Sequence, residues 1–227
     1  NAVFAHLFVG GTAEIELEAG TIRLIQETGF PWDGGVRVRV EAVDGKSFPQ
    51  GAFTLGVRIP AWSRIPVLSI MGEPANLDSL TVDGYARVTR TWQPGDYLDL
   101  DLDLRPVLVK AHPRVRANAG RVAVTFGPLA YCFEEVDNGD NLSALSIPVD
   151  APLKATFEPD LLGGVVAIGL EGLRDRETDW SSQELYRTVS QAEPAFSREA
   201  VTLRAIPYYA WNNRGVGEMA VWLRAAE

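Results

Sequence analysis

Residues 96–104 read DYLDLDLDL, a stretch in which leucine and aspartate alternate at every second position. Successive side chains of a β-strand point to opposite faces, so this pattern predicts a strand with one apolar and one acidic face. The apolar face would carry Leu98, Leu100, Leu102 and Leu104. The acidic face would carry Asp99, Asp101 and Asp103, roughly 6.6 Å apart at the usual strand rise. That spacing is too wide for neighbouring aspartates alone to hold a calcium ion, so we expect a solvated face that discourages edge-to-edge association.

The same period of two recurs along the whole chain, and helical periodicity is almost absent. Many short strands separated by turns rich in Gly, Asn and Asp are typical of antiparallel β-sandwiches rather than βαβ units. We therefore predict an all-β protein. Its strands are expected at 3–9, 12–17, 21–27, 36–43, 52–59, 66–71, 84–91, 96–104, 121–126, 129–135, 153–157, 165–170, 200–206 and 218–224.

The alternation lapses over residues 105–120, where Pro106 and Pro113 intervene. We place a domain boundary there and predict two consecutive antiparallel β-sandwich (jelly-roll-like) domains, at about 1–110 and 111–227. A polar stretch at about 172–197, rich in Arg, Glu, Ser and Asp, is predicted to be a long surface loop of the second sandwich.

Composition excludes several classes of partner. The 227 residues include 21 basic and 30 acidic ones, which gives a net charge of −9. Nucleic acids and anionic membranes bind basic surfaces, so we expect neither as a partner. The longest apolar runs have the length of strands, and none is long enough for a membrane-spanning helix.

The chain has one cysteine and two histidines, His6 and His112, which lie far apart. We therefore expect no internal disulfide and no metal or other cofactor in this chain. The cysteine count leaves the compartment open, with a lean towards the reducing cytoplasm. The chain begins without Met, and a strand pattern is already running at its third residue, so we expect it to be part of a longer protein.

Residues 208–215, YYAWNNRG, form the strongest candidate for a binding site. Rings flanked by hydrogen-bonding groups suit a sugar-binding platform, and they also suit a buried or interdomain contact, where one end of the ring stays apolar. We favour packing or an interdomain contact and keep sugar binding open. The residues concerned are Tyr208, Tyr209, Trp211, Asn212 and Arg214. Trp32, beside Asp33 in a predicted turn, is expected to cover the edge of the first sandwich, with a sugar or interdomain contact as the alternative.

Residues 127–138, GPLAYCFEEVDN, place Cys132 close to Glu134 and Glu135 and raise the question of a catalytic thiol. In a strand, Cys132 and Glu134 share a face and Glu135 points away. A nearby carboxylate disfavours the thiolate, whereas an activated cysteine needs a cationic or metal environment. We therefore interpret Cys132 as a buried strand residue and assign no catalytic residue to this chain.

Several segments together resemble the C-terminal half of glycoside hydrolase family 127, the β-L-arabinofuranosidase-like proteins. These segments are ETGFPWDGGVRVRV, VRIPAWS, DGYARVTRTWQPGDYLDLDLDL, AGRVAVTFGPLAYCFEEVDN and IPYYAWNNRGVGEMAVWLR, and they run in order along nearly the whole chain. The resemblance implies that an N-terminal (α/α)₆ barrel, absent here, carries the chemistry: a zinc-bound cysteine as nucleophile and a glutamate as acid–base. Two β-sandwich domains follow that barrel.

The resemblance implies a function for this region as well. The parent protein would cleave terminal furanosides, and the barrel's Cys-Cys pair has no counterpart here, so no catalytic residue or metal ligand carries over. We expect an inactive accessory region whose partner is the missing barrel of the same protein. A carbohydrate-binding module for a plant-glycan oligosaccharide and a structural domain that forms a homodimer are the alternatives.

Overall fold

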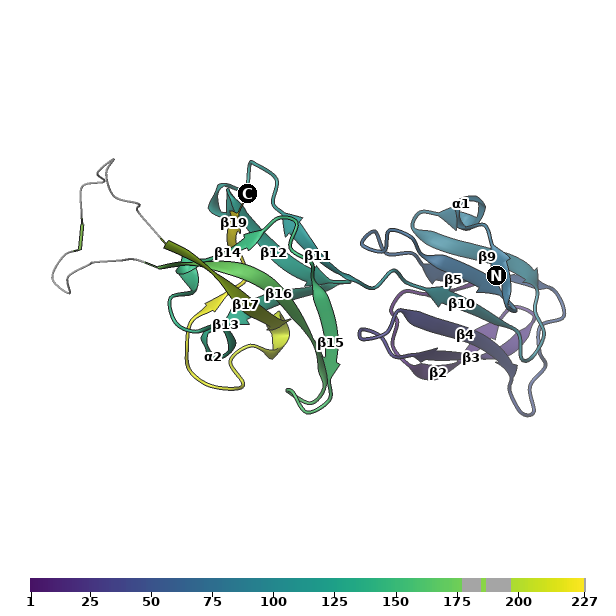
Figure 1. Cartoon of the computed structure of the whole chain (residues 1–227). Coiled ribbons are helices and arrows are strands. Elements are labelled where there is room, and N and C mark those ends of the chain that lie inside the picture. Colours follow the sequence, from purple (N-terminus) through teal and green to yellow (C-terminus); the bar gives the residue numbers. More distant parts are fainter. Residues whose placement is uncertain (177–184, 187–196, 227) are drawn as a thin grey trace. The chain divides into compact units, whose positions relative to one another are not determined.

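The computed structural model describes residues 1–176, 185–186 and 197–226, and its regular structure is almost entirely β (Figure 1). The all-β fold class predicted from the period of two is confirmed. The chain forms two compact units, residues 1–104 and 105–227. Helices in the described ranges are limited to single turns, α1 (Leu77–Leu80), α2 (Glu135–Asn138) and three 3₁₀ segments, and none is long and apolar enough to cross a membrane.

The chain passes from the first unit to the second between Leu104 and Arg105, at the start of the segment 105–120 in which we expected the boundary. The segment that was expected to be a linker begins with strand β11 (Pro106–Lys110), which pairs antiparallel with β12 (Arg121–Phe126) along its whole length. Pro106 sits at the first position of this strand, where a missing N–H is tolerated.

The first unit contains two sheets (Figure 1). The four-stranded sheet runs in the order β1 (Ala2–Ala5), β5 (Ala52–Arg58), β9 (Tyr85–Thr91) and β8 (Thr81–Val82). The six-stranded sheet runs in the order β2 (Gly11–Leu17), β3 (Gly20–Thr28), β4 (Gly35–Ala42), β10 (Tyr97–Asp101), β6 (Val67–Ile70) and β7 (Glu73–Ala75). All pairs are antiparallel except β1 with β5.

Both sheets contribute to one core in the first unit. The leucines of DYLDLDLDL are buried at 98, 100 and 102, as the alternation predicted, although the strand itself ends at Asp101. They meet apolar residues of the other sheet, including Phe53 and Val88. Trp92, 1% exposed, packs on Phe53 and donates its indole N–H to the Phe53 carbonyl at 3.0 Å. A buried indole with its polar atom satisfied adds apolar burial without leaving an unpaired donor.

The second unit is one hydrogen-bonded sheet of nine strands rather than the predicted second pair of sheets. Besides β11 and β12, its strands are β13 (Leu129–Glu134), β14 (Leu145–Pro148), β15 (Lys154–Glu158), β16 (Val165–Arg176), β17 (Ser197–Pro207), β18 (Met219–Ala220) and β19 (Leu223–Ala226). The strand pairs form a closed circuit from β12 through β13, β17, β16, β14 and β19 back to β12.

Strand β19 closes this circuit, so the described strands of the second unit form one connected sheet, and the predicted second sandwich is not confirmed. Strand β19 pairs antiparallel with β12 and parallel with β14, so it joins strands that would otherwise form separate sheets. Val122 of β12 pairs with both Lys110 and Leu223, and Thr125 pairs with both Val107 and Ala130. Because β11 occupies one edge of β12, strands β13 and β19 both meet the other edge, one near each end.

The polar segment predicted as a loop at about 172–197 is partly strand. Residues 172–176 continue β16, and Ser197 begins β17, with the two strands paired in register from Ile168–Ala205 to Arg176–Ser197. Exposed charged side chains made this end of the hairpin look like a loop, because only one of its faces is buried. The remainder of the predicted loop, 177–184 and 187–196, lies outside the described residues.

Candidate functional site

The segment 208–214, hereafter the aromatic turn, follows β17 and begins with the 3₁₀ segment η3 (Tyr208–Ala210). Pro207 precedes it and ends the strand. The rings of Tyr208 and Trp211 stack, with centroids 6.2 Å apart and an interplanar angle of 11°. Both side chains remain accessible, at 45% and 40%, and Tyr209 beside them is exposed. The turn therefore presents a small aromatic surface to solvent.

The polar residues of the aromatic turn face inward instead. Arg214 binds Glu134 through Nε at 3.1 Å and Nη2 at 2.5 Å, and it binds Asp137 through Nη1 at 3.0 Å and Nη2 at 2.5 Å. The other Glu134 oxygen accepts the backbone N–H of Asn212 at 2.9 Å. Asn212 has a φ of +65°, a left-handed conformation that asparagine tolerates better than most residues. These bonds fix the backbone that carries the exposed rings.

The contacts of Arg214 extend into a larger network of charged and amide groups. Arg204 on β17 donates to Asp137 at 3.1 Å and forms a second ion pair with Glu158 on β15. Asn138, at the end of α2, donates to the carbonyls of Glu134 and Arg204 and accepts the Arg204 N–H, each at 2.9 Å. We call the set Glu134, Asp137, Asn138, Glu158, Arg204 and Arg214 the buried ion network.

The buried ion network is built to hold charge rather than to move protons. The side chains of Glu134 and Asp137 are only 6% and 9% exposed, and both accept hydrogen bonds from guanidinium groups, which bind the ionised carboxylate. The hydrogen bonds to Asp137 and Glu134 raise the pKa of Arg214 further above its ordinary value against the opposing effect of burial. The oxygens of both carboxylates are thus engaged within the protein, by Arg214, Arg204 and the Asn212 N–H.

Cys132 lies on β13, two residues before Glu134, and is fully buried. It packs against Ile206 and Ala210, with Leu161, Leu162, Met219 and Val221 around them. Burial, and after it the charge of Glu134, raises the pKa of the Cys132 thiol to about 12, from an ordinary value of 9.0. A thiol in this environment stays protonated and unreactive near neutral pH. Glu135 turns away into α2, where its carboxylate accepts the Glu218 N–H at 2.8 Å.

Trp32 belongs to the first unit, whereas the other predicted site residues belong to the second. It lies between β3 and β4 and is half-buried. Its backbone N–H donates to the carbonyl of Gly29 at 3.0 Å. This is the hairpin turn that the sequence predicted for it. The structure thus brings together Tyr208, Tyr209, Trp211, Asn212 and Arg214 in a single turn, with the last of them committed to the buried ion network.

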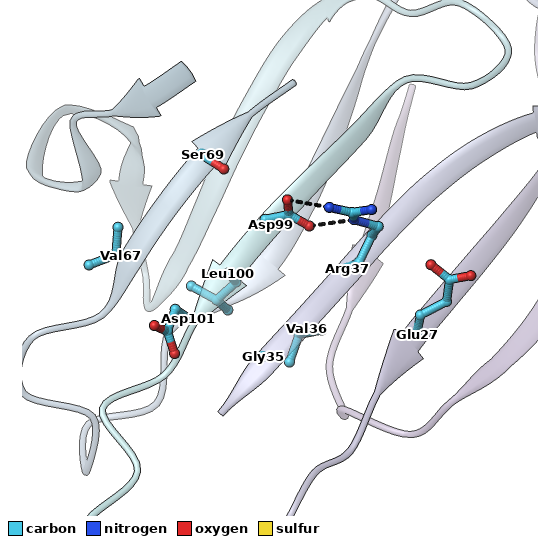
Figure 2. Close-up of a pocket in the computed structure, with 9 residues that line it drawn as sticks. All are labelled: Glu27, Gly35, Val36, Arg37, Val67, Ser69, Asp99, Leu100 and Asp101. Carbon is cyan, nitrogen blue, oxygen red and sulfur yellow. Dashed lines mark hydrogen bonds and ion pairs between the residues drawn. The ribbon is translucent and has the colours of Figure 1, made fainter. Parts of the chain in front are cut away.

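A polar groove on the six-stranded sheet of the first unit was not predicted (Figure 2). Its volume is about 400 Å³. One row of side chains crosses four neighbouring strands in register: Glu27 on β3, Arg37 on β4, Asp99 on β10 and Ser69 on β6. The next row along the strands contains Gly35, Asp101 and Val67. We call this site the sheet groove.

An arginine–aspartate pair lies at the centre of the sheet groove (Figure 2). The Arg37 Nε and Nη2 atoms donate to the two oxygens of Asp99 at 2.7 and 2.8 Å, and the guanidinium carbon lies 4.3 Å from the centroid of the Tyr97 ring. The hydrogen bond to Asp99 raises the pKa of Arg37 above its ordinary value. The guanidinium of Arg37 is thus held at its edge by the Asp99 carboxylate and on its face by the Tyr97 ring.

The sequence carried half of the signal for this groove. The alternation in DYLDLDLDL predicted that Asp99 and Asp101 share one face, and VRVRV at 36–40 predicts the same for Arg37 and Arg39. Which arginine faces which aspartate depends on the register of β4 against β10, strands that lie 62 positions apart at this pair. Register of this kind is fixed by the fold and cannot be obtained from the pattern of either strand alone.

No candidate metal site is found in the part of the chain that the structure describes, where no group of three or more His, Cys, Asp and Glu is placed to hold an ion. Cys132 is buried among apolar side chains, so it does not fit the zinc-bound thiolate that the family resemblance implies for the barrel. His6, in turn, bonds the Tyr85 hydroxyl through Nδ1 at 2.7 Å.

Family models match both units of the chain. The model described as "Beta-L-arabinofuranosidase, GH127 middle domain" matches residues 2–104. The model described as "Glycoside hydrolase family 127 C-terminal domain" matches residues 106–224. Together they cover nearly the whole chain, in the order in which the segments resemble the family.

Individual relatives agree with these models. A non-reducing end β-L-arabinofuranosidase of Bifidobacterium longum subsp. longum is 40% identical over 98% of this chain, which corresponds to 33% of the relative. A solved GH127 β-L-arabinofuranosidase from Geobacillus stearothermophilus T6 matches 99% of this chain, with 46% identity and a TM-score of 0.89, over 34% of its own length. A second solved GH127 β-arabinofuranosidase matches 99% of the chain, with 32% identity and a TM-score of 0.83, over 35% of its own length.

The chain therefore spans about a third of the length of these relatives. Its first unit corresponds to the middle domain and its second unit to the C-terminal domain of the family. On these matches, this chain belongs to glycoside hydrolase family 127.

Proposed function

We propose that this chain is the non-catalytic accessory region of an enzyme that hydrolyses terminal furanosides, with β-L-arabinofuranosides as the expected substrates. The observation that carries the proposal is the coverage: nearly the whole chain matches about a third of each relative, and it does so through the middle and C-terminal domains. Relatives named as β-L-arabinofuranosidases supply the substrate class.

The residues of this chain favour an accessory role over a catalytic one. Its single thiol is buried and has a raised pKa, and the nearly enclosed carboxylates of Glu134 and Asp137 are bound by Arg214. A retaining hydrolysis needs a nucleophile and an acid–base that both reach the anomeric carbon and the leaving oxygen. In our proposal both groups, and the zinc that the family resemblance implies, belong to the catalytic barrel, and the partner of this region is that barrel.

The test compares the 227-residue chain with the full-length parent protein, each incubated with 4-nitrophenyl β-L-arabinofuranoside. We expect 4-nitrophenol release from the parent only. Zinc should be present in the parent, measured by atomic emission, and absent from the purified chain. Release by the chain alone, without bound zinc, would overturn its accessory role, and a parent that cleaves only other glycosides would overturn the substrate.

A second candidate function is carbohydrate binding through the aromatic turn. The observation that favours it is the stacked and accessible pair of Tyr208 and Trp211 on a backbone that Glu134 and Arg214 hold in place. The test is calorimetric titration with arabino-oligosaccharides of the chain and of Trp211→Ala. Phe157→Ala serves as the matched control, because Phe157 is also exposed and lies on another strand of the same unit. Equal binding by the chain and by Trp211→Ala would remove this candidate.

The same aromatic surface would serve a protein contact, either with the barrel or with a second copy of the chain, which is the homodimer considered from the sequence. Aromatic side chains are enriched in the cores of such interfaces. Light scattering of the chain over a range of concentrations checks the second possibility. A molar mass that stays at that of one chain would count against a homodimer formed by this region.

A further inference from the structure

The sheet groove differs from an ordinary solvated sheet face because several of its polar groups keep free hydrogen-bonding capacity. Arg37 uses two of its five N–H donors on Asp99, and each Asp99 oxygen keeps a free lone pair. Within the described residues, the side chains of Ser69 and Asp101 make no hydrogen bond or ion pair. Side chains that served only to hold neighbouring strands together would not need free hydrogen-bonding groups beside the Arg37–Asp99 ion pair.

The shape of the sheet groove leaves room for a ligand beside these groups (Figure 2). Gly35 pairs directly with Asp101 and adds no side chain of its own to the groove, while the Asp33 carboxylate accepts its N–H at 2.6 Å. Val67, on the other side of Asp101, is 58% exposed and offers an apolar surface. A volume of about 400 Å³ falls within the range of small-ligand sites, which is about 300–1,000 Å³.

The arrangement matches the chemistry of a sugar. Adjacent hydroxyl groups of a saccharide each donate and accept a hydrogen bond, and a rigid guanidinium–carboxylate pair offers donors and acceptors in one plane. The C–H face of the sugar ring would pack on Val67, while Ser69 and Asp101 would bind further hydroxyls. Of the three carboxylates in the lining, Asp99 binds Arg37 and Glu27 pairs with Arg39 at 3.5 Å, which leaves Asp101 without an ion pair among the described residues to repel an anionic ligand.

We propose that the sheet groove is a binding site for a neutral saccharide, held through vicinal hydroxyl groups by Arg37 and Asp99. The choice of an arabinose-containing saccharide rests on the proposed function. The site lies in the first unit, on side chains separate from those of the aromatic turn, so the two can be tested independently.

The experiment titrates the ¹⁵N-labelled 227-residue chain with arabinotriose and follows the amide resonances. Xylotriose and trigalacturonic acid are the comparison ligands. We expect saturable shifts with arabinotriose that map to β4, β6 and β10, and none with trigalacturonic acid. Affinity should be weak, in the millimolar range, because the groove is open and shallow.

Two variants and their controls decide whether the binding is at the sheet groove. Val67→Trp fills the groove without removing a hydrogen-bonding group, and Val82→Trp places the same side chain at another exposed valine of the first unit. Asp101→Asn should weaken binding about tenfold through the loss of a charge-assisted hydrogen bond, which corresponds to about 1.4 kcal/mol. Asp44→Asn, an exposed turn residue, is its control. Thermal unfolding of each variant checks that the fold is retained.

Loss of the shifts in Val67→Trp with retention in Val82→Trp would support the site. Binding that survives Val67→Trp, or equal binding of trigalacturonic acid, would overturn it, and so would the absence of shifts with every saccharide. Binding of xylotriose in place of arabinotriose would keep the saccharide site and contradict the substrate class of the proposed function. The two failures are therefore distinguishable.

Discussion

The two units each contain an arginine bound to an aspartate by two hydrogen bonds, yet the surroundings of the two pairs differ. In the second unit Arg214 and Asp137 are almost enclosed, with Glu134 and Arg204 completing the network. In the first unit Arg37 and Asp99 lie on an open sheet face. Removing one partner of a buried pair leaves an uncompensated charge in the interior, whereas an exposed charge is solvated by water. The Arg214–Asp137 pair therefore supports the fold, and the Arg37–Asp99 pair remains available for a ligand.

The largest expected effect concerns whether the region around the buried ion network is closed to solvent. Cys132 lies next to this network on β13, and its pKa is raised from 9.0 to about 12. At pH 8 the folded chain therefore has a smaller thiolate population than the unfolded chain. Three pH units correspond to about a thousandfold less thiolate. Labelling by a thiol reagent at pH 8 should be slower in the folded chain than in urea by at least that factor, because burial adds steric protection. Rapid labelling of the folded chain would contradict this enclosure.

The next effect is expected from Arg214→Met. This change leaves Glu134 and Asp137 buried without their main partner, and we expect a loss of about 3 kcal/mol in the free energy of unfolding of the second unit. Urea unfolding followed by NMR resonances of that unit measures it. Arg121→Met is the control, because Arg121 is exposed and, within the described residues, its side chain bonds only to the Trp222 carbonyl, and it should cost no more than about 0.5 kcal/mol. A loss below about 1 kcal/mol in Arg214→Met would remove the distinction between the two pairs.

Asn138→Ala should have a smaller effect, about 2 kcal/mol. Asn138 satisfies two carbonyls and one N–H, all from residues of the buried ion network, and alanine would leave these groups without a partner. Asn213→Ala is the matched control. Asn213 is exposed, and in the part of the chain that the structure describes its side chain bonds only to carbonyls two and three residues away. The same urea unfolding experiment measures both variants, and equal losses would show that Asn138 does not hold β13 to β17.

The smallest effect is expected at the exposed pair. A double-mutant cycle with Arg37→Met and Asp99→Asn should give a coupling energy below about 1 kcal/mol. That energy should fall further in about 1 M salt, where charges on the surface are screened. The matching cycle with Arg214→Met and Asp137→Asn should give a larger coupling that is less sensitive to salt. Equal couplings in the two cycles would contradict the comparison from which these predictions start.

Much of the fold could be predicted from alternation, and most of what could not depends on pairs distant in sequence. The buried leucines at 98, 100 and 102 followed directly from period-two reasoning, and so did the location of most strands. The closed circuit of the second unit did not follow, because β19 is placed by partners on β12 and β14. A short strand of four residues carries no signal for which distant edge it will join.

The candidate site shows the same division. Clustered aromatic and polar residues at 208–214 led us to predict a contact segment, and the stacked Tyr208 and Trp211 are accessible there, although the contact itself stays a prediction. Arg214 was grouped with them as a contact residue, but its partner Glu134 lies 80 positions upstream. Asp99 was interpreted as solvated, whereas Arg37 binds it across the sheet. In both cases the residue type indicated a polar role, and only the tertiary contacts decided which one.

The position of β19 has a consequence for how the chain acquires its structure during synthesis. Trp222, next to β19, accepts a hydrogen bond from Arg121, 101 positions earlier in the chain, and one edge of β12 is complete only when β19 has paired with it. Contacts this distant are slow to form because the loop between them must be ordered first. The first unit is compact in itself and ends at Leu104. It can therefore fold on the ribosome while the second unit is still being made, and the second unit completes its sheet only when its last strand emerges.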